Sequence, residues 1–335
     1  MPEEYHYRKA LQIGMWHSTA SPESPLLQET WDAFHENIDR VNALGSLPIK
    51  LVALSTLMEH HKLVALHNLN ISPTDKRVVS EHKDFDPALF NKADEERVSI
   101  LRDWFAAYPN HDAILQKIGF DGMRRLVEND NDSMKKGEKY ILSAMLSGSW
   151  TAFESLVGDL WVVALNKGSR KFARNIYTKT AGNMTPDNDG KKSDHKMVHI
   201  TAIEDFDFDL REKMGSLLRD NGKVDFQSLK NTATAYEEAF GQSAGALFDK
   251  KNKDQANILV LSAIRNSIEH RAGRVDLNFQ RRVRGCTAST YCSLEKIPLN
   301  ELLPIDGEMV KELCTSVTKS ATDIMKFVDA KMKLT

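Results

Sequence analysis

The sequence predicts an all-α protein, and three observations support this. Apolar residues recur at three-and-four spacing in one segment after another, and acidic starts and glycine ends bound several of these segments. Strand signals are few, with one short hairpin arm expected within residues 289–299. Hydrophobic residues make up 41% of the chain and charged residues 27%, which is ordinary for a soluble globular protein of 335 residues.

Three helices are expected in the first third of the chain. Residues 25–45 form the first, which we expect to end at Gly45, and its apolar face consists of Leu27, Trp31, Phe34, Ile38 and Val41. Residues 47–68 are apolar nearly all round in their first half, which favours a buried helix. After a polar interval at 71–94, residues 94–109 form the third helix, closed by Pro109.

The longest predicted helix covers residues 134–166, about 50 Å at the usual rise per residue. A polar break at 180–196 follows, and further helices are expected at 207–222, 225–241, 254–270 and 306–333. The last of these has an apolar face made of Val310, Leu313, Val317, Ile324 and Val328. A polar run at 129–132 suggests two domains: an N-terminal helical region of unknown role at 1–130 and a helical bundle at 131–335.

The charge and the cysteines restrict the location and the partners. The formal net charge is −2, so binding of a polyanion requires a local basic patch. The start lacks the apolar core of a secretory signal, and no apolar run approaches bilayer-spanning length. Cys286, Cys292 and Cys314 have no metal-ligand spacing and are expected to be buried thiols. We therefore expect a cytoplasmic protein without membrane contact.

The stretch LSAIRNSIEHRAGRVDLNF, residues 261–279, carries the chemistry. Asn266 and His270 are four apart and share a helix face, and Arg265 lies about 140° from His270 around the axis. Gly273 is expected to end this helix. His270 could move a proton, Arg265 could hold a phosphate in a forked manner, and Asn266 could orient either.

RNA supplies its own nucleophile in the 2′-hydroxyl group, so such a site requires neither a metal nor another cofactor. A basic cluster suited to a nucleic-acid backbone follows the motif, with Asp276 as its sole acid: Arg271, Arg274, Arg281, Arg282 and Arg284. One helix offers one histidine, and two-proton chemistry requires a second group. A twofold homodimer would supply a second copy of His270.

The arrangement Arg-Asn-x-x-x-His at a helix end, followed by Gly and VD, resembles the signature of HEPN domains, which are all-α bundles that include metal-independent ribonucleases. Residues 147–161, SGSWTAFESLVGDLW, are similar to the long helix with an aromatic-Glu pair in that superfamily, and residues 226–241 resemble its connecting helix. The resemblance covers residues 134–335. It implies that Arg265 and His270 are the catalytic pair, with Asn266 beside them and Glu154 as a supporting carboxylate.

The resemblance further implies an endoribonuclease acting in defence, a toxin–antitoxin system or a stress response, with RNA as substrate and an antitoxin or other regulatory protein as a further partner. Ala272 stands where HEPN toxins modified by a nucleotidyltransferase antitoxin carry tyrosine, so that kind of partner is less favoured. The products would carry a 2′,3′-cyclic phosphate or its hydrolysed form.

Other interpretations stay open. Arg265 and Asn266 could bridge helices while His270 satisfies a C-terminal carbonyl, in a non-catalytic helical dimer that binds nucleic acid or protein. His195 and His199 are four apart, but no Cys lies nearby and no Glu stands between them, so we expect no metal there. The adjacent His60 and His61 point to different faces and are expected to be ordinary helix residues.

Overall fold

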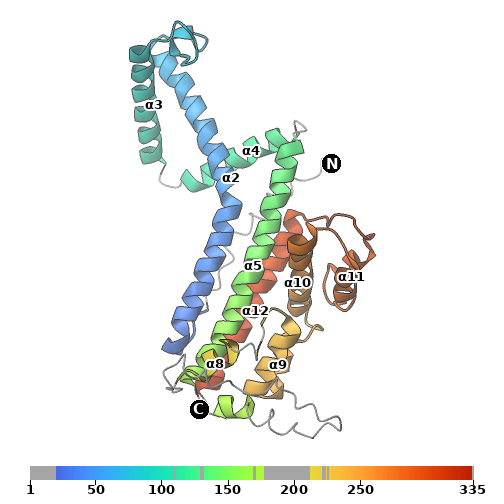
Figure 1. Cartoon of the computed structure of the whole chain (residues 1–335). Helices are drawn as coiled ribbons and strands as arrows, with labels where there is room; N and C mark the ends of the chain where they lie inside the picture. The colour runs from blue at the N-terminus through green and yellow to red at the C-terminus, as the bar shows by residue number, and fades with distance from the viewer. Residues whose placement is uncertain are drawn as a thin grey trace. The chain divides into compact units, whose positions relative to one another are not determined.

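The computed structural model describes residues 20–108, 111–128, 132–168, 171–176, 212–220, 224 and 226–333. Every regular element among these residues is helical, which confirms the predicted all-α class (Figure 1). The α-helices are α2 (Gln28–Asn68), α3 (Pro87–Ala107), α4 (His111–Glu128), α5 (Asp132–Lys167), α8 (Met214–Asp220), α9 (Leu229–Phe240), α10 (Lys253–Arg271), α11 (Leu277–Arg284) and α12 (Gly307–Lys333). Short 3₁₀ segments are η1 (Pro25–Leu27), η2 (Lys76–Val78), η4 (Gln242–Phe248) and η5 (Cys292–Lys296).

The described chain divides into two compact units. The smaller contains residues 43–138, and the larger contains residues 20–42 and 139–333. The second break lies near the polar run at 129–132 that suggested a domain seam. The first part of α2, up to Asn42, belongs to the larger unit, whereas the sequence-based division grouped it with the N-terminal region.

The larger unit has one extensive apolar core. Within it, α5, α10 and α12 run alongside one another (Figure 1), and α10 packs against both α12 and α11. The predicted apolar faces of residues 25–45 and 306–333 are buried, as is the stripe of α5. The largest fully buried side chains of this unit are Trp31, Phe34, Trp150, Phe153, Trp161 and Tyr236. Burial of these rings together with the surrounding aliphatic side chains stabilises the unit.

Polar contacts fix α9 to α5 inside this core. The buried Tyr236 hydroxyl donates to the Val157 carbonyl at 2.7 Å, and the Trp161 indole donates to the Ala235 carbonyl at 3.1 Å. Burial raises the pKa of Tyr236 far above its usual value, and Asp159 adds to the effect. The phenol therefore stays a neutral hydrogen-bond donor.

Asp329 connects the last helix to the beginning of the described chain. Its carboxylate accepts from the backbone N–H groups of Glu23 and Ser24, each at 2.9 Å, and lies 3.3 Å from Lys333 Nζ. Burial opposes ionisation of Asp329, but these hydrogen bonds and Lys333 outweigh it and hold the pKa of Asp329 below its usual value.

The smaller unit contains the later part of α2 with α3 and α4. Ala53 and Leu57 of α2 pack with Leu115 of α4, and the Trp104 and Phe105 rings of α3 cover this cluster. A second cluster joins the end of α2 to η2 and the start of α3, through Leu66, Ile71, Val78 and Ala93. The two clusters hold three helices together with small apolar contacts.

Helix α4 approaches α2 closely at Gly119. A Cβ atom there would lie 2.2 Å from the carbonyl oxygen of Ile49, so no larger residue fits without movement of the backbone. Gly137 at the start of α5 has no atom within 4 Å of such a Cβ. The first glycine is therefore required by packing, and the second is not.

The predicted helix end at Gly45 was wrong. Helix α2 runs through Gly45 and Pro48 for 41 residues, and Ile49 and Ala53 just beyond are buried. Burial beyond the break outweighs the local cost of Gly and Pro in a helix interior. The continuous segment Pro25–Asn68 is long and apolar enough to cross a membrane by length and composition alone, with a window of mean hydropathy 1.4 of which 28% is buried. This contradicts the expectation that no apolar run approaches bilayer-spanning length. Core helices of soluble proteins can also be this long and apolar.

Other predicted elements differ in detail. The hairpin arm expected within residues 289–299 is instead a turn followed by η5. Helices α4 and α11 have no counterpart among the predicted helices. The polar break at 180–196 lies outside the described residues.

Candidate active site

Helix α10 carries the Arg-Asn-x-x-x-His motif on its last two turns. The Asn252 side chain caps its start by accepting from the Asp254 N–H at 2.8 Å. Ile258, Leu261 and Ile264 are completely buried against the core, as their spacing predicted. The helix ends at Arg271, so His270 is its second-last residue.

The chain turns sharply directly after the motif. Ala272 is left-handed with φ 51°, Gly273 has φ 76°, and the N–H groups of both donate to the Ser267 carbonyl. The buried Ser267 hydroxyl also donates to the Arg274 carbonyl at 2.7 Å. This is the capped C-terminal end that Gly273 predicted, with one more left-handed residue than expected.

Two pairs of residues four apart lie on neighbouring faces of α10: Arg265 with Glu269, and Asn266 with His270. Arg265 Nε lies 2.7 Å from Glu269 Oε1, and the side chains are 27% and 35% exposed. The N–H of that Nε does not reach hydrogen-bond geometry, so the attraction is that of an ion pair. Arg265 Nη1 also donates to Asn266 Oδ1 at 3.2 Å. Arg265 is therefore held along the helix by Glu269 and Asn266.

The His270 side chain is exposed and makes no hydrogen bond with the described residues. The alternative in which it satisfies a carbonyl at the helix end is not realised within this part of the chain, where backbone N–H groups cap the Ser267 carbonyl. The imidazole is thus open to solvent and to a ligand.

Glu154 of α5 contacts a different partner. Its Oε2 accepts from the Trp150 indole N–H at 2.8 Å, one helical turn away. The aromatic-Glu pair expected from the sequence is present, and a supporting catalytic role for Glu154 stays a prediction.

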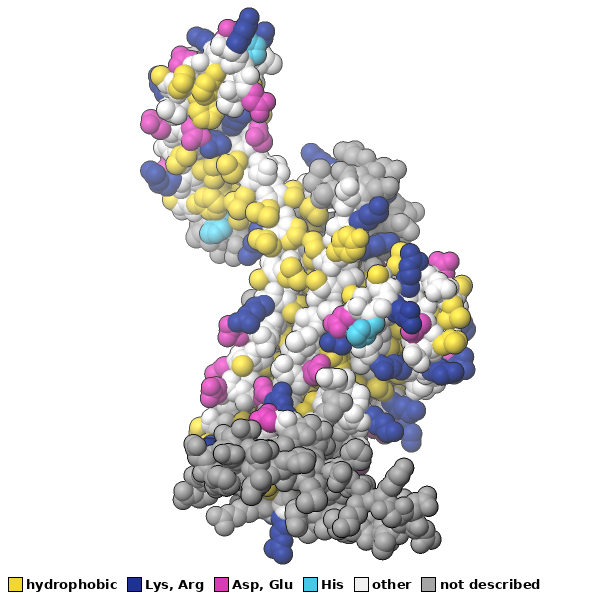
Figure 2. Space-filling view, in the orientation of Figure 1, with side chains coloured by type: hydrophobic (Ala, Val, Ile, Leu, Met, Phe, Trp, Pro, Cys, Tyr) yellow, Lys and Arg dark blue, Asp and Glu magenta, His cyan; other side chains and the backbone are white. Residues whose placement is uncertain are grey.

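The predicted basic cluster begins at Arg271, the last residue of α10, and continues through the following turn onto α11. Figure 2 shows Lys and Arg side chains gathered over this part of the molecule. Arg281 and Arg282 are exposed, and no described residue forms an ion pair with either. These two guanidinium groups are therefore available to an anionic ligand.

The other three arginines of the cluster have partners. Arg271 Nε lies 3.6 Å from Asp276, Arg274 donates to the Asn300 carbonyl at 2.7 Å, and Arg284 Nε lies 3.1 Å from Glu295. The expectation that Asp276 is the sole acid of this region was wrong. Glu295 is 11 residues from Arg284, and only the folding of η5 brings the two together.

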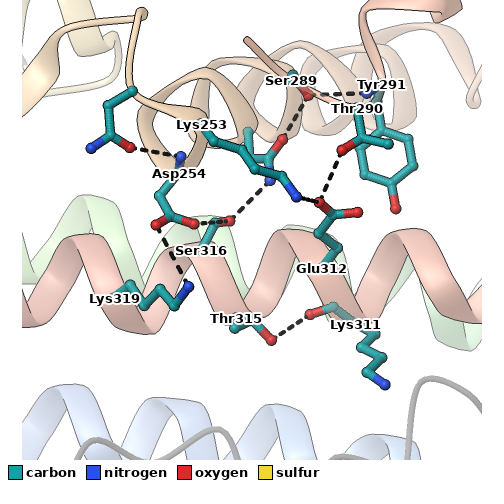
Figure 3. Close-up of polar contacts among 12 residues, drawn as sticks. Lys253, Asp254, Ser289, Thr290, Tyr291, Lys311, Glu312, Thr315, Ser316 and Lys319 are labelled. Atoms are coloured by element: carbon teal, nitrogen blue, oxygen red, sulfur yellow. Dashed lines mark hydrogen bonds and ion pairs between the residues drawn. The ribbon is translucent and has the colours of Figure 1, made fainter.

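A buried polar network fixes the first half of α10 (Figure 3). Asn257 is completely buried: its Nδ2 donates to Ser316 Oγ at 3.0 Å and its Oδ1 accepts from Ser289 Oγ at 2.6 Å. Ser316 in turn donates to Asp254 at 2.8 Å. The network ties α10 to α12 and to the turn after α11, so the motif and the basic cluster share one rigid support.

Glu312 of α12 adds further contacts between α12, the start of α10 and the turn after α11. Lys253 Nζ lies 2.6 Å from its Oε1, and Thr290 donates to the same oxygen at 3.0 Å. Burial opposes ionisation, but hydrogen bonds from Lys253, Tyr291 and Thr290 outweigh it and hold the pKa of Glu312 below its usual value. Burial, with the hydrogen bond to Glu312, raises the pKa of Tyr291 far above its usual value. Both groups act as fixed structural partners.

Two of the three cysteines are buried thiols. Cys286, Cys292 and Cys314 are free, and Cys286 and Cys314 are buried. Burial raises the pKa of Cys314 to about 12 and also raises that of Cys286. Because the thiolate is the reactive form, these two thiols are inert near neutral pH.

The described residues contain no cluster of three or more His, Cys, Asp or Glu side chains arranged to hold a metal ion. His195 and His199 lie outside the described residues. His61 is buried with its Nδ1 2.8 Å from the Leu57 carbonyl, and His60 is exposed, so the two neighbours do point to different environments.

No family model, curated protein or solved structure that was compared with the chain matches it. The resemblance to HEPN domains therefore rests on the motif and the helix order alone.

Proposed function

We propose that the protein is a metal-independent endoribonuclease of the HEPN type. The observation that carries the proposal is the accessible end of α10, where the exposed His270 stands one turn from Asn266, and Asn266 contacts the partly exposed Arg265. An accessible imidazole can exchange protons with a substrate, and a guanidinium can bind a phosphate through two parallel hydrogen bonds. Arg281 and Arg282 support the proposal, because they offer a nucleic-acid backbone two charges that no described residue neutralises.

In this proposal the RNA 2′-hydroxyl group attacks the adjacent phosphorus, and the bond to the 5′-oxygen of the next nucleotide breaks. Arg265 stabilises the charge that develops on the phosphate oxygens, and His270 moves a proton. Asn266, already in contact with Arg265 at 3.2 Å, keeps the guanidinium oriented. One product carries a 2′,3′-cyclic phosphate or its hydrolysed form, and no cofactor enters the reaction.

We further propose that the protein acts as a cytoplasmic homodimer, since a twofold axis would bring two copies of His270 to one groove. A defence, toxin–antitoxin or stress-response setting fits such an enzyme, with an antitoxin or another regulatory protein restraining it. The residues of the N-terminal region specify no trigger.

A second candidate is a non-catalytic helical dimer that binds RNA or protein. One observation favours it: Glu269 already neutralises Arg265 in the free chain, at 2.7 Å. In that case α10 would be a salt-bridged surface helix, and the arginines of α11 would provide the binding.

Cleavage of labelled RNA by purified protein in the presence of EDTA tests the proposal. Wild type should cleave, and the variants H270A and R265A should each lose at least about a hundredfold in rate. K326A, which removes an exposed charge on α12 outside the polar network around Asn257, is the control and should keep wild-type activity. Equal cleavage by wild type and H270A, or cleavage that EDTA abolishes in wild type, would contradict the proposal.

A further inference from the structure

Cleavage through the 2′-hydroxyl group moves two protons. One leaves the attacking hydroxyl group, and one must reach the departing 5′-oxygen. His270 is the one histidine of the Arg-Asn-x-x-x-His motif and of the sequence after position 199. Either a second chain or a different residue must supply the other proton-transfer group.

Glu269 is the carboxylate that the structure places against the motif. Its Oε1 lies 2.7 Å from Arg265 Nε, its side chain is 35% exposed, and it precedes the exposed His270 directly. Arg265 and Glu269 form one i,i+4 pair, and Asn266 and His270 lie on the adjacent face. Around the helix axis Glu269 lies about 40° from Arg265 and about 100° from His270, so the carboxylate stands between the guanidinium and the imidazole.

Four other acids of this unit have different contacts from those of Glu269. Asp276 caps α11 by accepting from the Phe279 N–H at 2.7 Å, and Glu295 pairs with Arg284. Glu154 accepts from the Trp150 indole. The side chain of Glu301 is exposed and has no partner among the described residues, but it contacts no motif residue there. Glu269 contacts Arg265 directly, at 2.7 Å.

We propose that Glu269 is a further catalytic residue and acts as the general base of the proposed reaction. The Glu269 carboxylate takes the proton of the 2′-hydroxyl group as the bond from O2′ to phosphorus forms. The bond from phosphorus to O5′ breaks, and the protonated imidazole of His270 delivers its proton to O5′. Arg265 is released from Glu269 as the carboxylate takes up the proton, and its charge then stabilises the phosphate oxygens. This assignment rests on the proposed ribonuclease function and supplies the second proton-transfer group from the same helix as His270.

The test is the pH dependence of single-turnover RNA cleavage by the full-length protein. A base that must be deprotonated and an acid that must be protonated give a bell-shaped profile, with the rate falling at low pH and at high pH. E269Q should lower the rate by about 10²–10⁴-fold and remove the low-pH limb. E269D should restore part of the rate together with that limb. E301Q, which removes the same charge from an exposed position, should behave as wild type.

A 2′-O-methyl RNA of the same sequence cannot be cleaved. Its binding therefore distinguishes a catalytic role of Glu269 from a structural one. E269Q should bind it at least as tightly as wild type, because a competing anion has been removed from Arg265. Weaker binding by E269Q would assign Glu269 a structural role and overturn the proposal. Cleavage by E269Q within threefold of wild type, or a surviving low-pH limb, would also overturn it while leaving the ribonuclease function intact. Absence of cleavage by wild type would instead remove the function itself, and this proposal with it.

Discussion

Replacing Arg281 and Arg282 together by alanine should weaken RNA binding in a salt-dependent manner. Both side chains are exposed, and no described residue neutralises either, so each can replace a counterion on an RNA phosphate. For a single strand the logarithm of the binding constant falls with the logarithm of salt concentration by about 0.7 per phosphate contact. The double variant should therefore flatten this slope by about 1.4. Fluorescence anisotropy with a labelled 2′-O-methyl RNA, over a series of salt concentrations, measures it.

Two control variants test whether the effect is specific to Arg281 and Arg282. R284A should change the slope less than either single variant of Arg281 or Arg282, because Glu295 already neutralises Arg284 at 3.1 Å. The double variant R40A/R102A removes the same total charge from α2 and α3 and should leave the slope unchanged. An unchanged slope in R281A/R282A, or an equal effect of R40A/R102A, would refute the assignment of α11 as the RNA-contacting helix.

The remaining predictions concern stability, each measured by urea unfolding. A272G should stabilise the protein by about 0.5–1 kcal/mol, since glycine adopts the observed φ of 51° without strain; a loss of stability would contradict the left-handed end of α10. D329N should destabilise it by about 1.5–3 kcal/mol at neutral pH. Because the pKa of Asp329 is lowered in the folded state, its contribution is present above the ordinary carboxyl pKa and is lost as the pH falls, so the difference from wild type should shrink below about pH 4. G119A should cost roughly 1–3 kcal/mol because its Cβ would lie 2.2 Å from the Ile49 carbonyl, whereas G137A, with nothing within 4 Å, should not destabilise.

The buried faces of the long helices could be predicted because burial follows the helical period. Trp31, Phe34 and Ile38 are buried as their spacing indicated, and so is the face of α12. The break at Gly45 could not be judged locally, because packing beyond Pro48 decides whether the helix continues. Helix α11 is short and rich in arginine, so the sequence has no long apolar stripe there that would predict a helix.

The candidate site shows the same division between local and distant contacts. The helix end after His270 followed from Gly273, although Ala272 shares the left-handed conformation. The contact between Arg265 and Glu269 was missed, yet its signal was available: opposite charges four residues apart on a helix. The pair of Arg284 with Glu295 and the network around Asn257 depend on how separate segments fold together, so no spacing in the sequence indicates them.

The chemical nature of the RNA ends produced by the purified protein tests the central claim most directly. After incubation in EDTA, mass spectrometry of the fragments should find a 2′,3′-cyclic phosphate or its hydrolysed form on one side of each cut and a 5′-hydroxyl group on the other. The same fragments should be missing with H270A. Fragments with 5′-phosphate ends, or identical fragments from wild type and H270A, would contradict the account.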